Sequence, residues 1–461
     1  MQHDLTVVIL AAGMGTRMKS ALPKVLHEAG GMPIVEHVVQ SAGEKAPFEK
    51  VVVVTGHGAA QVEEHLAHYP VRFVRQTEQN GTGHALMVAG EQVPKKEGLL
   101  VVLYGDCPLL SAETIGRLLE QHAASGAAAT VITAVLDDPT GYGRMILDED
   151  GNCLAIVEQK AASPEQLAIR EINSGIYCFD AALLWRHLAE IQPNAASGEL
   201  YLTDMVEILR GHGHPVKTLR VPDAAEILGI NTRVELAQAD RYLRDRKAKQ
   251  LMLDGVTIER PETVTIDKFV EIGQDTVVEA FVQLRGKTRI GSNCRIGTGS
   301  VLNGAKVADD VMIHPYCIVA DSVLENGAHL GPFARLRMQA TVSENAHVGN
   351  FVELKKTHLG AGAKAMHLAY LGDSQIGEKV NIGAGTITCN YDGVNKHATV
   401  IGPGAFVGSN STLVAPVEIG AGAYVGAGSV ITDGVPPETL ALGRARQVVK
   451  TDWQRRPKKL S

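Results

Sequence analysis

The stretch LRGKTRIGSNCRIGTGSVL (284–302) places an apolar residue at every sixth position. These residues are Leu284, Ile290, Ile296 and Leu302, and small or polar residues fill the intervals between them. A repeat of six residues is typical of a parallel β-helix, in which each apolar side chain points into a triangular core and short turns form the corners.

The same period extends in both directions from this stretch. It starts at Ile266, slips by one residue before Val307, continues to Leu354, and returns from Ile376 to Val425. Gly often follows the apolar residue, as in the IG pairs that begin at 272, 290, 296, 376, 382, 401 and 419. We therefore expect residues 253–461 to form a β-helix domain with a C-terminal tail.

The repeat resembles that of the left-handed β-helix family, an exception to the right-handed crossover rule. Members of that family are usually trimers, so the resemblance implies a homotrimer. For a bare repeat, the alternative is a structural spacer without a site of its own.

Residues 1–230 have a different pattern, in which apolar runs alternate with longer helical segments. The expected strands are 6–10, 50–56, 99–106 and 129–136, and the expected helices are 33–43, 58–67, 83–92 and 111–125. This alternation predicts a Rossmann-like α/β domain with a mostly parallel sheet, whose ligands bind at the carboxyl ends of the strands.

Residues 231–252 are expected to form a linker helix between these two regions. Asn231 or Thr232 can cap it, and one face carries Leu236, Ala239, Leu243 and Leu251.

Composition excludes several functional classes. The chain has 461 residues and a formal net charge of -7, which argues against general nucleic-acid binding. Its six cysteines have no zinc-ligand spacing, and no apolar stretch is long enough to cross a bilayer. These features predict a cytoplasmic protein with reduced thiols and no membrane insertion.

The segment LAAGMGTRMKSALPK (10–24) follows the first strand directly and is rich in Gly and basic residues. Such loops bind phosphates through backbone amides. The spacing is not that of a P-loop, and Met18 replaces the final Gly of a dinucleotide fingerprint. The segment resembles the LxxGxGxRxx…PK motif of sugar-nucleotide pyrophosphorylases. That resemblance implies a nucleotide loop formed by Leu10, Ala11, Ala12 and Gly13, with Arg17 and Lys24 on phosphate oxygens.

Further segments follow in the order expected for that family: QTEQNGTGHAL (76–86), YGD (104–106), GYGR (141–144), VEQK (157–160), INSG (172–175) and LGIN (228–231). The resemblance implies contacts to uracil and the loop from Gln76, Gln79, Gly81 and Thr82. It implies further nucleotide contacts from Tyr104, Gly105 and Asp106, and sugar contacts from Gly143, Glu158 and Asn173. It also implies a divalent metal held by Asp106 and Asn231.

The residues themselves suit this chemistry. Mg²⁺ prefers a few hard oxygen ligands and shares its other positions with substrate phosphates, as Asp106 and the Asn231 amide would allow. Attack by a sugar phosphate on a nucleotide needs alignment and charge neutralisation but no general base, because a phosphate monoester with a second pKa of about 6 is already ionised. Taken singly, Asp106 or Asn231 could instead cap a helix.

The β-helix region carries polar residues where the repeat is interrupted. ARLRMQA (334–340) and NFVELKKTH (350–358) introduce Arg337, Lys355 and Lys356. A cation inside a tight coil is costly, so these side chains should face solvent or a phosphate.

KAMHLAYLGD (364–373) adds His367 and Tyr370, and a histidine with an ordinary pKa near 6.5 can accept the proton of an attacking amine. Backbone N–H groups at 383–385 could stabilise the charge that develops on an acyl oxygen.

These motifs together resemble, over nearly the whole chain, the bacterial family of bifunctional enzymes that acetylate glucosamine 1-phosphate with acetyl-CoA and then uridylylate N-acetylglucosamine 1-phosphate with UTP and Mg²⁺. The resemblance implies that His367 is the catalytic base and that the sugar phosphate is bound by Arg337, Lys355, Tyr370 and Asn381. It implies acetyl-CoA contacts from Ala384, Asn390, Tyr391, Ser409, Ala427 and Arg444. Met338 departs from the family pattern, in which Pro follows the arginine.

Several alternatives stay open at this point. The protein could be a monofunctional pyrophosphorylase with a non-catalytic, trimerising β-helix, in which His367 is an inert residue at a repeat corner. Tyr370 could bind substrate or orient the histidine. The basic tail WQRRPKK (453–459) could contact CoA or be a solvated terminus. If His367 is catalytic, we expect subunit packing in a trimer to enclose its exposed face.

Overall fold

The computed structural model describes residues 4–93, 96–149, 151–195 and 197–455. The chain divides into two units, Met1–Leu243 and Arg244–Ser461. Among the described residues, no helix combines the length and the apolar character needed to cross a membrane.

The first unit is built around one mixed sheet with the strand order β11-β7-β10-β6-β1-β4-β5. Strands β6, β1, β4 and β5 run parallel, and β10 is antiparallel to both of its neighbours. Two further strands, β8 and β9, extend the sheet beside β10. The strands are β1 (Leu5–Ala11), β4 (Val51–Thr55), β5 (Arg72–Arg75), β6 (Leu99–Tyr104), β7 (Ala129–Val135), β8 (Arg144–Leu147), β9 (Cys153–Val157), β10 (Glu171–Asp180) and β11 (Val216–Arg220).

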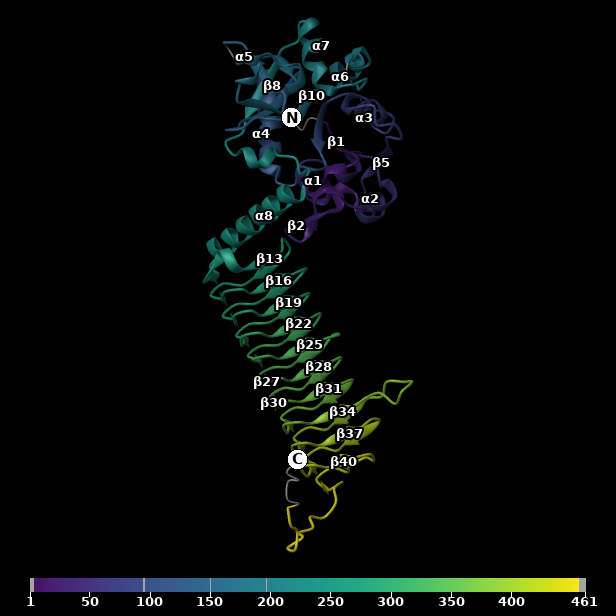
Figure 1. Ribbon diagram of the computed structural model, residues 1–461, viewed down its shortest axis with the longest axis vertical. Coiled ribbons are helices and arrows are strands. Elements are labelled where there is room, and N and C mark those ends of the chain that lie inside the picture. The colour runs from purple at the N-terminus through teal and green to yellow at the C-terminus, as the bar shows by residue number, and fades with distance from the viewer. Residues whose placement is uncertain (1–3, 94–95, 150, 196, 456–461) are drawn as a thin grey trace, which may run out of the picture. The chain divides into compact units, whose positions relative to one another are not determined.

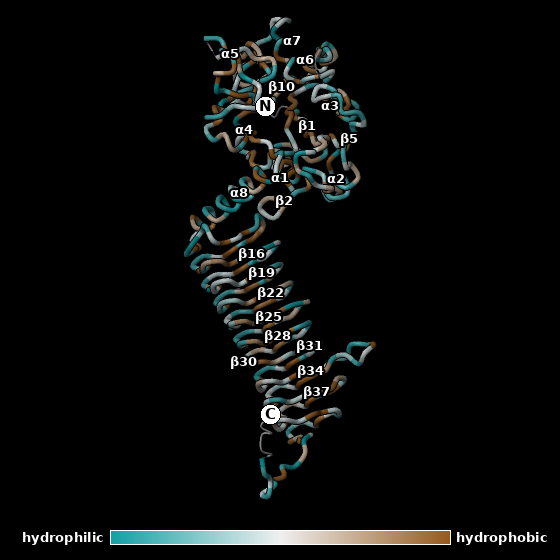
Figure 2. The backbone as a smooth tube through the Cα atoms, viewed as in Figure 1, coloured by the Kyte–Doolittle hydropathy of each residue, from teal (hydrophilic) through white to brown (hydrophobic). Residues whose placement is uncertain are grey.

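Helices cover both faces of this sheet because its strands are apolar on both sides. In β1, which is hydrophobic over most of its length (Figure 2), Val7 and Ile9 enter one core and Val8 and Leu10 enter the other. The first core is covered by α1 (Ile34–Gly43), α2 (Ala59–Leu66) and α4 (Ala112–Ser125). The second is covered by α3 (Thr82–Ala89), α6 (Ala181–His187) and α7 (Met205–Gly211). The α/β fold expected from the alternating pattern is confirmed.

The helix expected near 231–252 is α8 (Arg233–Leu253). Thr232 begins it with a capping box: its Oγ1 accepts from the Glu235 N–H at 3.2 Å, while Glu235 Oε2 accepts from the Thr232 N–H at 2.8 Å. Ala239 and Leu243 lie in a core of the first unit, whereas Ala248 and Leu251 lie in the core of the second.

The second unit is a left-handed β-helix: the hexapeptide period predicted the β-helix, and the resemblance of the repeat implied its hand. Its strands, β12 (Thr257–Ile258) to β41 (Leu440–Ala441), fall into three sheets of 11, 10 and 9 strands. Each sheet takes every third strand, except that β41 follows β39 in the first. Successive strands of a sheet pair in parallel and stack as rungs (Figure 1), for example β16, β19 and β22. The three strands are Gln283–Arg285, Val301–Asn303 and Ile318–Ala320.

The apolar residues of the repeat form one continuous core. Leu284 pairs with Leu302 one coil later, and Leu302 pairs with Val319; each of the three is at most 1% exposed. The glycines of the IG pairs have a steric cause. A Cβ at Gly273 would lie 2.6 Å from the Gly291 carbonyl carbon, and one at Gly297 would lie 2.5 Å from the Pro315 nitrogen. The corners therefore approach too closely for a larger residue.

Leu336→Ala tests this core. Leu336 lies on β25 (Arg335–Arg337), is fully buried, and pairs with Val319 and Leu354 in the adjacent coils. We expect the substitution to lower the stability of the β-helix by about 2–5 kcal/mol, since the cavity between stacked coils cannot collapse easily. Guanidinium unfolding followed by circular dichroism measures this loss. Val394→Ala, at a side chain that is 81% exposed, is the control, and equal midpoints for the two variants would contradict the assignment.

Candidate functional site

A cavity of about 410 Å³ opens in the first unit where β1 and β6 end. This position fits the rule that open α/β sheets bind ligands at the carboxyl ends of their strands. Eleven of the residues expected at the nucleotide line it: Leu10, Ala11, Ala12, Gly13, Lys24, Gln76, Gln79, Gly81, Thr82, Tyr104 and Asp106.

Two polar side chains converge on Lys24; Lys24 and Asp106 line this cavity, and Asn231 does not. Nζ of Lys24 lies 2.5 Å from Oδ2 of Asp106 and 3.2 Å from Oδ1 of Asn231. The Lys24 and Asp106 side chains are only 11% and 17% exposed, so their charges act on each other with little screening. Gly15, at φ +61°, makes room for this lysine, because a Cβ there would lie 2.5 Å from the Lys24 Cβ.

The two oxygens expected to hold a divalent metal fit that role. Both lie within hydrogen-bonding distance of the same Lys24 ammonium group. The carboxylate oxygen of Asp106 and the amide oxygen of Asn231 are therefore close enough to contact one cation together. Hard oxygen donors of this type suit Mg²⁺. The backbone supports the arrangement, because the Ile230 N–H donates to the Asp106 carbonyl at 2.9 Å.

The segment 76–82, expected to contact the base, is fixed against the Gly-rich loop. Gln79 Nε2 donates to the Ala12 carbonyl at 2.7 Å, and Gln76 Nε2 donates to the Gly81 carbonyl at 3.1 Å. Gly81 precedes α3 at φ +98°, and Thr82 Oγ1 accepts from the Leu202 N–H at 3.0 Å. Burial raises the pKa of Tyr104, and the Asp106 charge adds to this effect, so the Tyr104 hydroxyl is neutral near pH 7.

The three residues expected at the sugar lie together beside β8 and β10, although they do not line the 410 Å³ cavity. A Cβ at Gly143 would lie 3.5 Å from Glu158 Oε1 and 3.7 Å from the Asn173 Cβ, so only a glycine leaves this corner open. Asn173 is oriented by the Gly175 N–H, which donates to its Oδ1 at 2.9 Å. Partial desolvation, with help from the Asp204 charge, raises the pKa of Glu158.

Two expected nucleotide residues occupy other positions. Arg17 is exposed on the 3₁₀-helix η1 (Thr16–Met18) and does not line the cavity. Gly105 is buried behind it, where a Cβ would lie 2.9 Å from the Ala11 Cβ.

The cavity also has five lining residues that the sequence did not predict: Met14, Val25, Ala85, Glu199 and Tyr201. Glu199 and Tyr201 reach it because Leu200 pairs with residues 80 and 83. The Leu200 N–H donates to the Asn80 carbonyl, and the Gly83 N–H donates to the Leu200 carbonyl, both at 2.8 Å. No local motif marks this long-range pairing.

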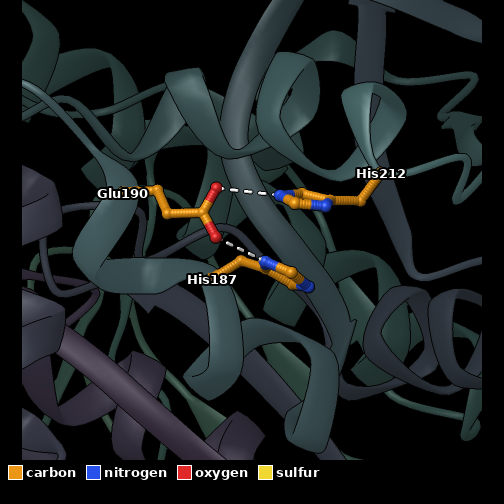
Figure 3. A group of neighbouring side chains, drawn as sticks. All are labelled: His187, Glu190 and His212. Atoms are coloured by element: carbon orange, nitrogen blue, oxygen red, sulfur yellow. Dashed lines mark hydrogen bonds and ion pairs between the residues drawn. The ribbon is translucent and has the colours of Figure 1, made fainter.

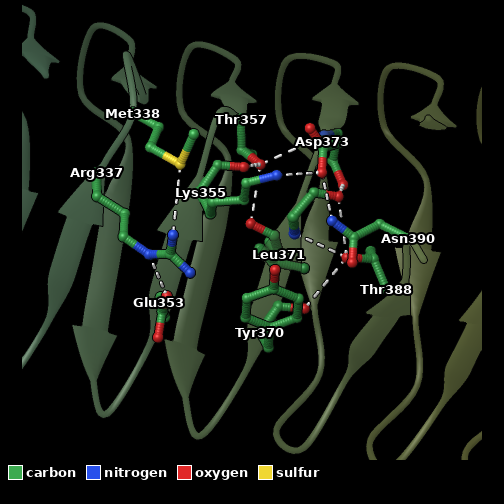
Figure 4. A network of polar contacts seen from close by, with 12 residues as sticks. Arg337, Met338, Glu353, Lys355, Thr357, Tyr370, Leu371, Asp373, Thr388 and Asn390 are labelled. Carbon is green, nitrogen blue, oxygen red and sulfur yellow. Dashed lines mark hydrogen bonds and ion pairs between the residues drawn. The ribbon is translucent and has the colours of Figure 1, made fainter. Parts of the chain in front are cut away.

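In the second unit, one sheet face carries a polar network across adjacent strands (Figure 4). Lys355, on β28 (Glu353–Lys355), forms an ion pair with Asp373 Oδ2 at 2.7 Å, and Asn390 Nδ2 donates to the same oxygen. Lys355 is only 8% exposed, so it faces this carboxylate rather than open solvent. Partial burial opposes ionisation of Asp373, but hydrogen bonds from Lys355 and Asn390 outweigh it and lower the pKa of Asp373.

Arg337 and Tyr370 lie on the same face. Arg337 Nε is 2.7 Å from Glu353 Oε1, and Glu353 pairs with Tyr370 of β31 (Tyr370–Gly372). Met338 adopts φ +56°, a conformation that proline cannot reach, and its Sδ accepts from Arg337 Nη1 at 3.4 Å. The face therefore presents a cation and a phenol beside the buried Lys355–Asp373 pair.

His367 ends β30 (Lys364–His367), on the neighbouring sheet. Its side chain is exposed, and its Nδ1 lies 2.7 Å from Oδ1 of Asn350 in the preceding coil. If Nδ1 carries the proton and donates it to Asn350, the lone pair of Nε2 is free to accept another. Asn381 is on this sheet too, paired with Lys364, whereas Arg337, Lys355 and Tyr370 are on the other. Within one chain, the residues expected at the acetyl site therefore lie on two different sheets of the β-helix.

Three of the residues expected at acetyl-CoA form a row along one corner of the β-helix. The Asn410 N–H donates to the Ala384 carbonyl at 2.7 Å, and the Gly428 N–H donates to the Ser409 carbonyl at 2.8 Å. Ala384, Ser409 and Ala427 therefore occupy equivalent positions in three successive coils. Glycines precede all three, and a Cβ at Gly408 would lie 2.4 Å from the Ala427 nitrogen.

Of the other expected acetyl-CoA residues, Asn390 and Tyr391 follow β34 (Ile387–Cys389) and Arg444 follows β41. Asn390 is buried in the polar network, whereas Tyr391, 55% exposed, begins a loop in which the Lys396 ammonium lies 4.2 Å from the centre of its ring. Arg444 is exposed beyond β41. In the basic tail, Trp453 is 71% exposed and residues 456–459 lie outside the described part of the chain.

These folds and their sites define a nucleotidyltransferase joined to a hexapeptide-repeat transferase. The family described as a MobA-like NTP transferase domain matches residues 7–231, and the bacterial transferase hexapeptide family matches residues 269–304 and 398–433.

The chain belongs to the family of bifunctional proteins called GlmU. It is 57% identical over 461 residues to the Bifunctional protein GlmU of Solibacter usitatus, covering 100% of this chain and 99% of that relative. It is also 48% identical to the protein of that name from Koribacter versatilis, covering 98% and 97% of the two chains, and 47% identical to that from Shouchella clausii, covering 97% and 98%. The resemblance found in the sequence is thereby confirmed, and the bifunctional interpretation is favoured over the monofunctional one.

Proposed function

We propose that this enzyme acetylates the amine of glucosamine 1-phosphate with acetyl-CoA and then transfers a uridylyl group from UTP to N-acetylglucosamine 1-phosphate, releasing pyrophosphate. The observation that carries the proposal is the contact of Lys24 with both Asp106 and Asn231 at the strand ends, where Lys24 and Asp106 line the cavity. The product, UDP-N-acetylglucosamine, would serve as a cytoplasmic precursor for peptidoglycan and lipopolysaccharide.

In the uridylyl step, the cavity residues bind UTP and align it with the sugar phosphate. Backbone groups of residues 10–13 and the Lys24 cation lie against the triphosphate, and Arg17, which is exposed outside the cavity lining, turns toward it when UTP binds. Gln76, Gln79, Gly81 and Thr82 hold the base. Gly143, Glu158 and Asn173 hold the acetylated sugar. Mg²⁺ held by Asp106 and Asn231 would neutralise phosphate charge during the displacement. The sugar phosphate oxygen forms a bond to the α-phosphorus, and pyrophosphate leaves.

In the acetyl step, Arg337 and Lys355 bind the phosphate of glucosamine 1-phosphate with help from Tyr370 and Asn381. Nε2 of His367 accepts a proton from the sugar amine as its nitrogen attacks the thioester carbonyl. The C–S bond then breaks, and the proton passes to the departing CoA thiolate. Acetyl-CoA lies along Ala384, Ser409 and Ala427, with Asn390, Tyr391 and Arg444 as further contacts.

The division of site residues between two faces supports a homotrimer. Since Asn381 and His367 are on one sheet and Arg337, Lys355 and Tyr370 are on another, we propose that neighbouring subunits bring the two faces together and enclose His367. We also propose the functional division 1–230 for uridylyl transfer, 231–252 for the linker helix and 253–461 for acetyl transfer.

Gly372→Ala is expected to damage the acetyl site. A Cβ at Gly372 would lie 2.6 Å from both the Tyr370 hydroxyl and the Asn390 Nδ2, so both side chains must move. Misplacing positioning groups by about 1 Å can cost about 10²-fold in rate, and we expect a loss of that order in kcat/KM for acetyl transfer. Gly434→Ala is the control, because the nearest atom to its Cβ would be 3.7 Å away. Equal acetyl transfer in the two variants would contradict this role for Gly372.

The proposal as a whole is tested with the full chain and two assays. Free thiol released from acetyl-CoA reports acetyl transfer, and pyrophosphate released from UTP in Mg²⁺ reports uridylyl transfer. Glucosamine 1-phosphate should yield both products only when acetyl-CoA is present, whereas N-acetylglucosamine 1-phosphate should yield pyrophosphate without it. A chain that releases pyrophosphate but never thiol would be the monofunctional alternative.

A further inference from the structure

Two imidazoles and one carboxylate meet on the first unit, outside the nucleotide cavity. His187 ends α6, Glu190 ends the 3₁₀-helix η5 (Leu188–Glu190), and His212 follows α7. His187 Nδ1 lies 2.7 Å from Glu190 Oε1, and His212 Nε2 lies 2.9 Å from Glu190 Oε2. Figure 3 shows both rings turned toward the carboxylate, each facing a different oxygen.

The geometry of this cluster is close to that of a ligand set. One donor atom from each of the three residues lies within 4.8 Å of the others, and the part of the chain that the structure describes contains no other group of three His, Cys, Asp or Glu side chains that does so. The two rings are tilted by 31° relative to each other, with centroids 4.0 Å apart. The His187 side chain is 9% exposed, and the Glu190 and His212 side chains are each 45% exposed. One donor is thus held firmly, while the other two can be reached from solvent.

We propose that His187, Glu190 and His212 form a binding site for a transition-metal ion of the Zn²⁺ type. Zn²⁺ takes imidazole nitrogens and carboxylate oxygens at about 2.0–2.2 Å, and water can occupy its remaining position. Mg²⁺ prefers oxygen ligands and suits Asp106 and Asn231 instead. The two sites therefore differ in the class of metal that they take.

Metal binding at this cluster needs only a small chemical change. With neutral rings, the hydrogen bonds to Glu190 use a proton on His187 Nδ1 and a proton on His212 Nε2. When the metal binds, the proton of each ring moves through solvent to its other nitrogen, Nε2 of His187 and Nδ1 of His212, so that the nitrogen facing Glu190 offers its lone pair to the metal. The ligands are then two neutral imidazoles and one carboxylate, and the Glu190 carboxylate offsets one of the two positive charges of the ion.

The site also lies at the start of a segment that lines the nucleotide cavity. Ile191 follows Glu190 directly and packs beside Gly83, where a Cβ would lie 3.0 Å from the Ile191 Cδ1. The segment then reaches Glu199 and Tyr201 at the cavity. A metal on Glu190 would fix the beginning of this segment, so we expect slower amide exchange at Ile191 and Gln192 when the metal is bound.

The test uses the untagged full-length protein after dialysis against a chelator. Co²⁺ is titrated with visible absorption as the readout, and Zn²⁺ with calorimetry. We expect one high-affinity ion per chain, and affinity at least about tenfold lower in His212→Ala and in Glu190→Gln, because even the outer partners of metal ligands are commonly worth 10–100-fold. Both substitutions are at partly exposed side chains, and neither residue is in the nucleotide or acetyl site.

A second carboxylate with two histidines provides the matched control. Glu36 contacts His65 at 2.8 Å and His68 at 3.5 Å, and His68 is 57% exposed, but this group does not meet the three-donor separation. His68→Ala should therefore bind Co²⁺ and Zn²⁺ as the wild type does, and Asp106→Asn should keep the same stoichiometry. The proposal is overturned if the wild-type protein binds neither ion, if His212→Ala and Glu190→Gln keep wild-type affinity, or if His68→Ala loses it.

Discussion

His367→Ala should lower acetyl transfer by about 10²–10⁴-fold, the usual contribution of a positioned general base, while uridylyl transfer stays unchanged. The physical reason is the ring geometry: Asn350 Oδ1, 2.7 Å from Nδ1, orients the imidazole so that Nε2 can take the amine proton. Thiol release from acetyl-CoA and pyrophosphate release from UTP, measured on the same preparation, give the two rates.

The control for this variant is another exposed histidine of the β-helix. His358, on β29 (His358–Leu359), is exposed in a different sheet, and His358→Ala should leave both activities intact. Asn350→Ala should reduce acetyl transfer less than His367→Ala does, because it removes the orienting acceptor but keeps the base. Loss of both activities in His367→Ala would argue against separate sites, and full acetyl transfer would remove His367 from the mechanism.

Asp106→Ala should produce the opposite result. We expect the rate of uridylyl transfer to fall by about 10²–10³-fold, which corresponds to about 3–4 kcal/mol of lost transition-state stabilisation, while acetyl transfer is retained. In the proposed mechanism Asp106 provides a hard oxygen for the divalent metal, and in the structure it lies 2.5 Å from Lys24 Nζ. Its removal leaves Lys24 without its carboxylate partner in the cavity that we propose for the triphosphate. Pyrophosphate release over a range of Mg²⁺ concentrations measures the effect.

An exposed aspartate of the same unit serves as the comparison. Asp137 is fully exposed and pairs with Arg170, so Asp137→Ala should keep both activities and the ordinary dependence on Mg²⁺. Pyrophosphate release by Asp106→Ala at the wild-type rate and the wild-type Mg²⁺ requirement would exclude Asp106 from the metal site.

The β-helix could be predicted from sequence because its cause is short-range. Each coil needs apolar residues such as Leu284 and Leu302 at fixed positions and glycines where corners approach, and both requirements repeat along the chain. The Gly-rich loop was also predictable, because Gly15 must leave space for Lys24 and their spacing is part of a local motif.

Other features could not be predicted because they depend on contacts between distant segments. Glu199 and Tyr201 enter the nucleotide cavity only through the pairing of Leu200 with residues near 80, which leaves no periodic signal. Asp373 ends the segment KAMHLAYLGD, but nothing in that segment reveals its bonds to Lys355 and Asn390. Arg17 shows the reverse case, since a residue that matches a motif lies outside the cavity lining.

Ala384, Ser409 and Ala427 are evenly spaced along the β-helix, because they occupy equivalent positions in successive coils. Neighbouring strands of a sheet are about 4.8 Å apart, so these three positions in successive coils span on the order of 10 Å. An extended ligand bound along this corner would contact positions that are separated by whole coils. The distance between two contacts can therefore change only in steps of one coil. Deleting the coil that contains Ser409 would therefore shift every later contact by about 4.8 Å while leaving the core residues in register.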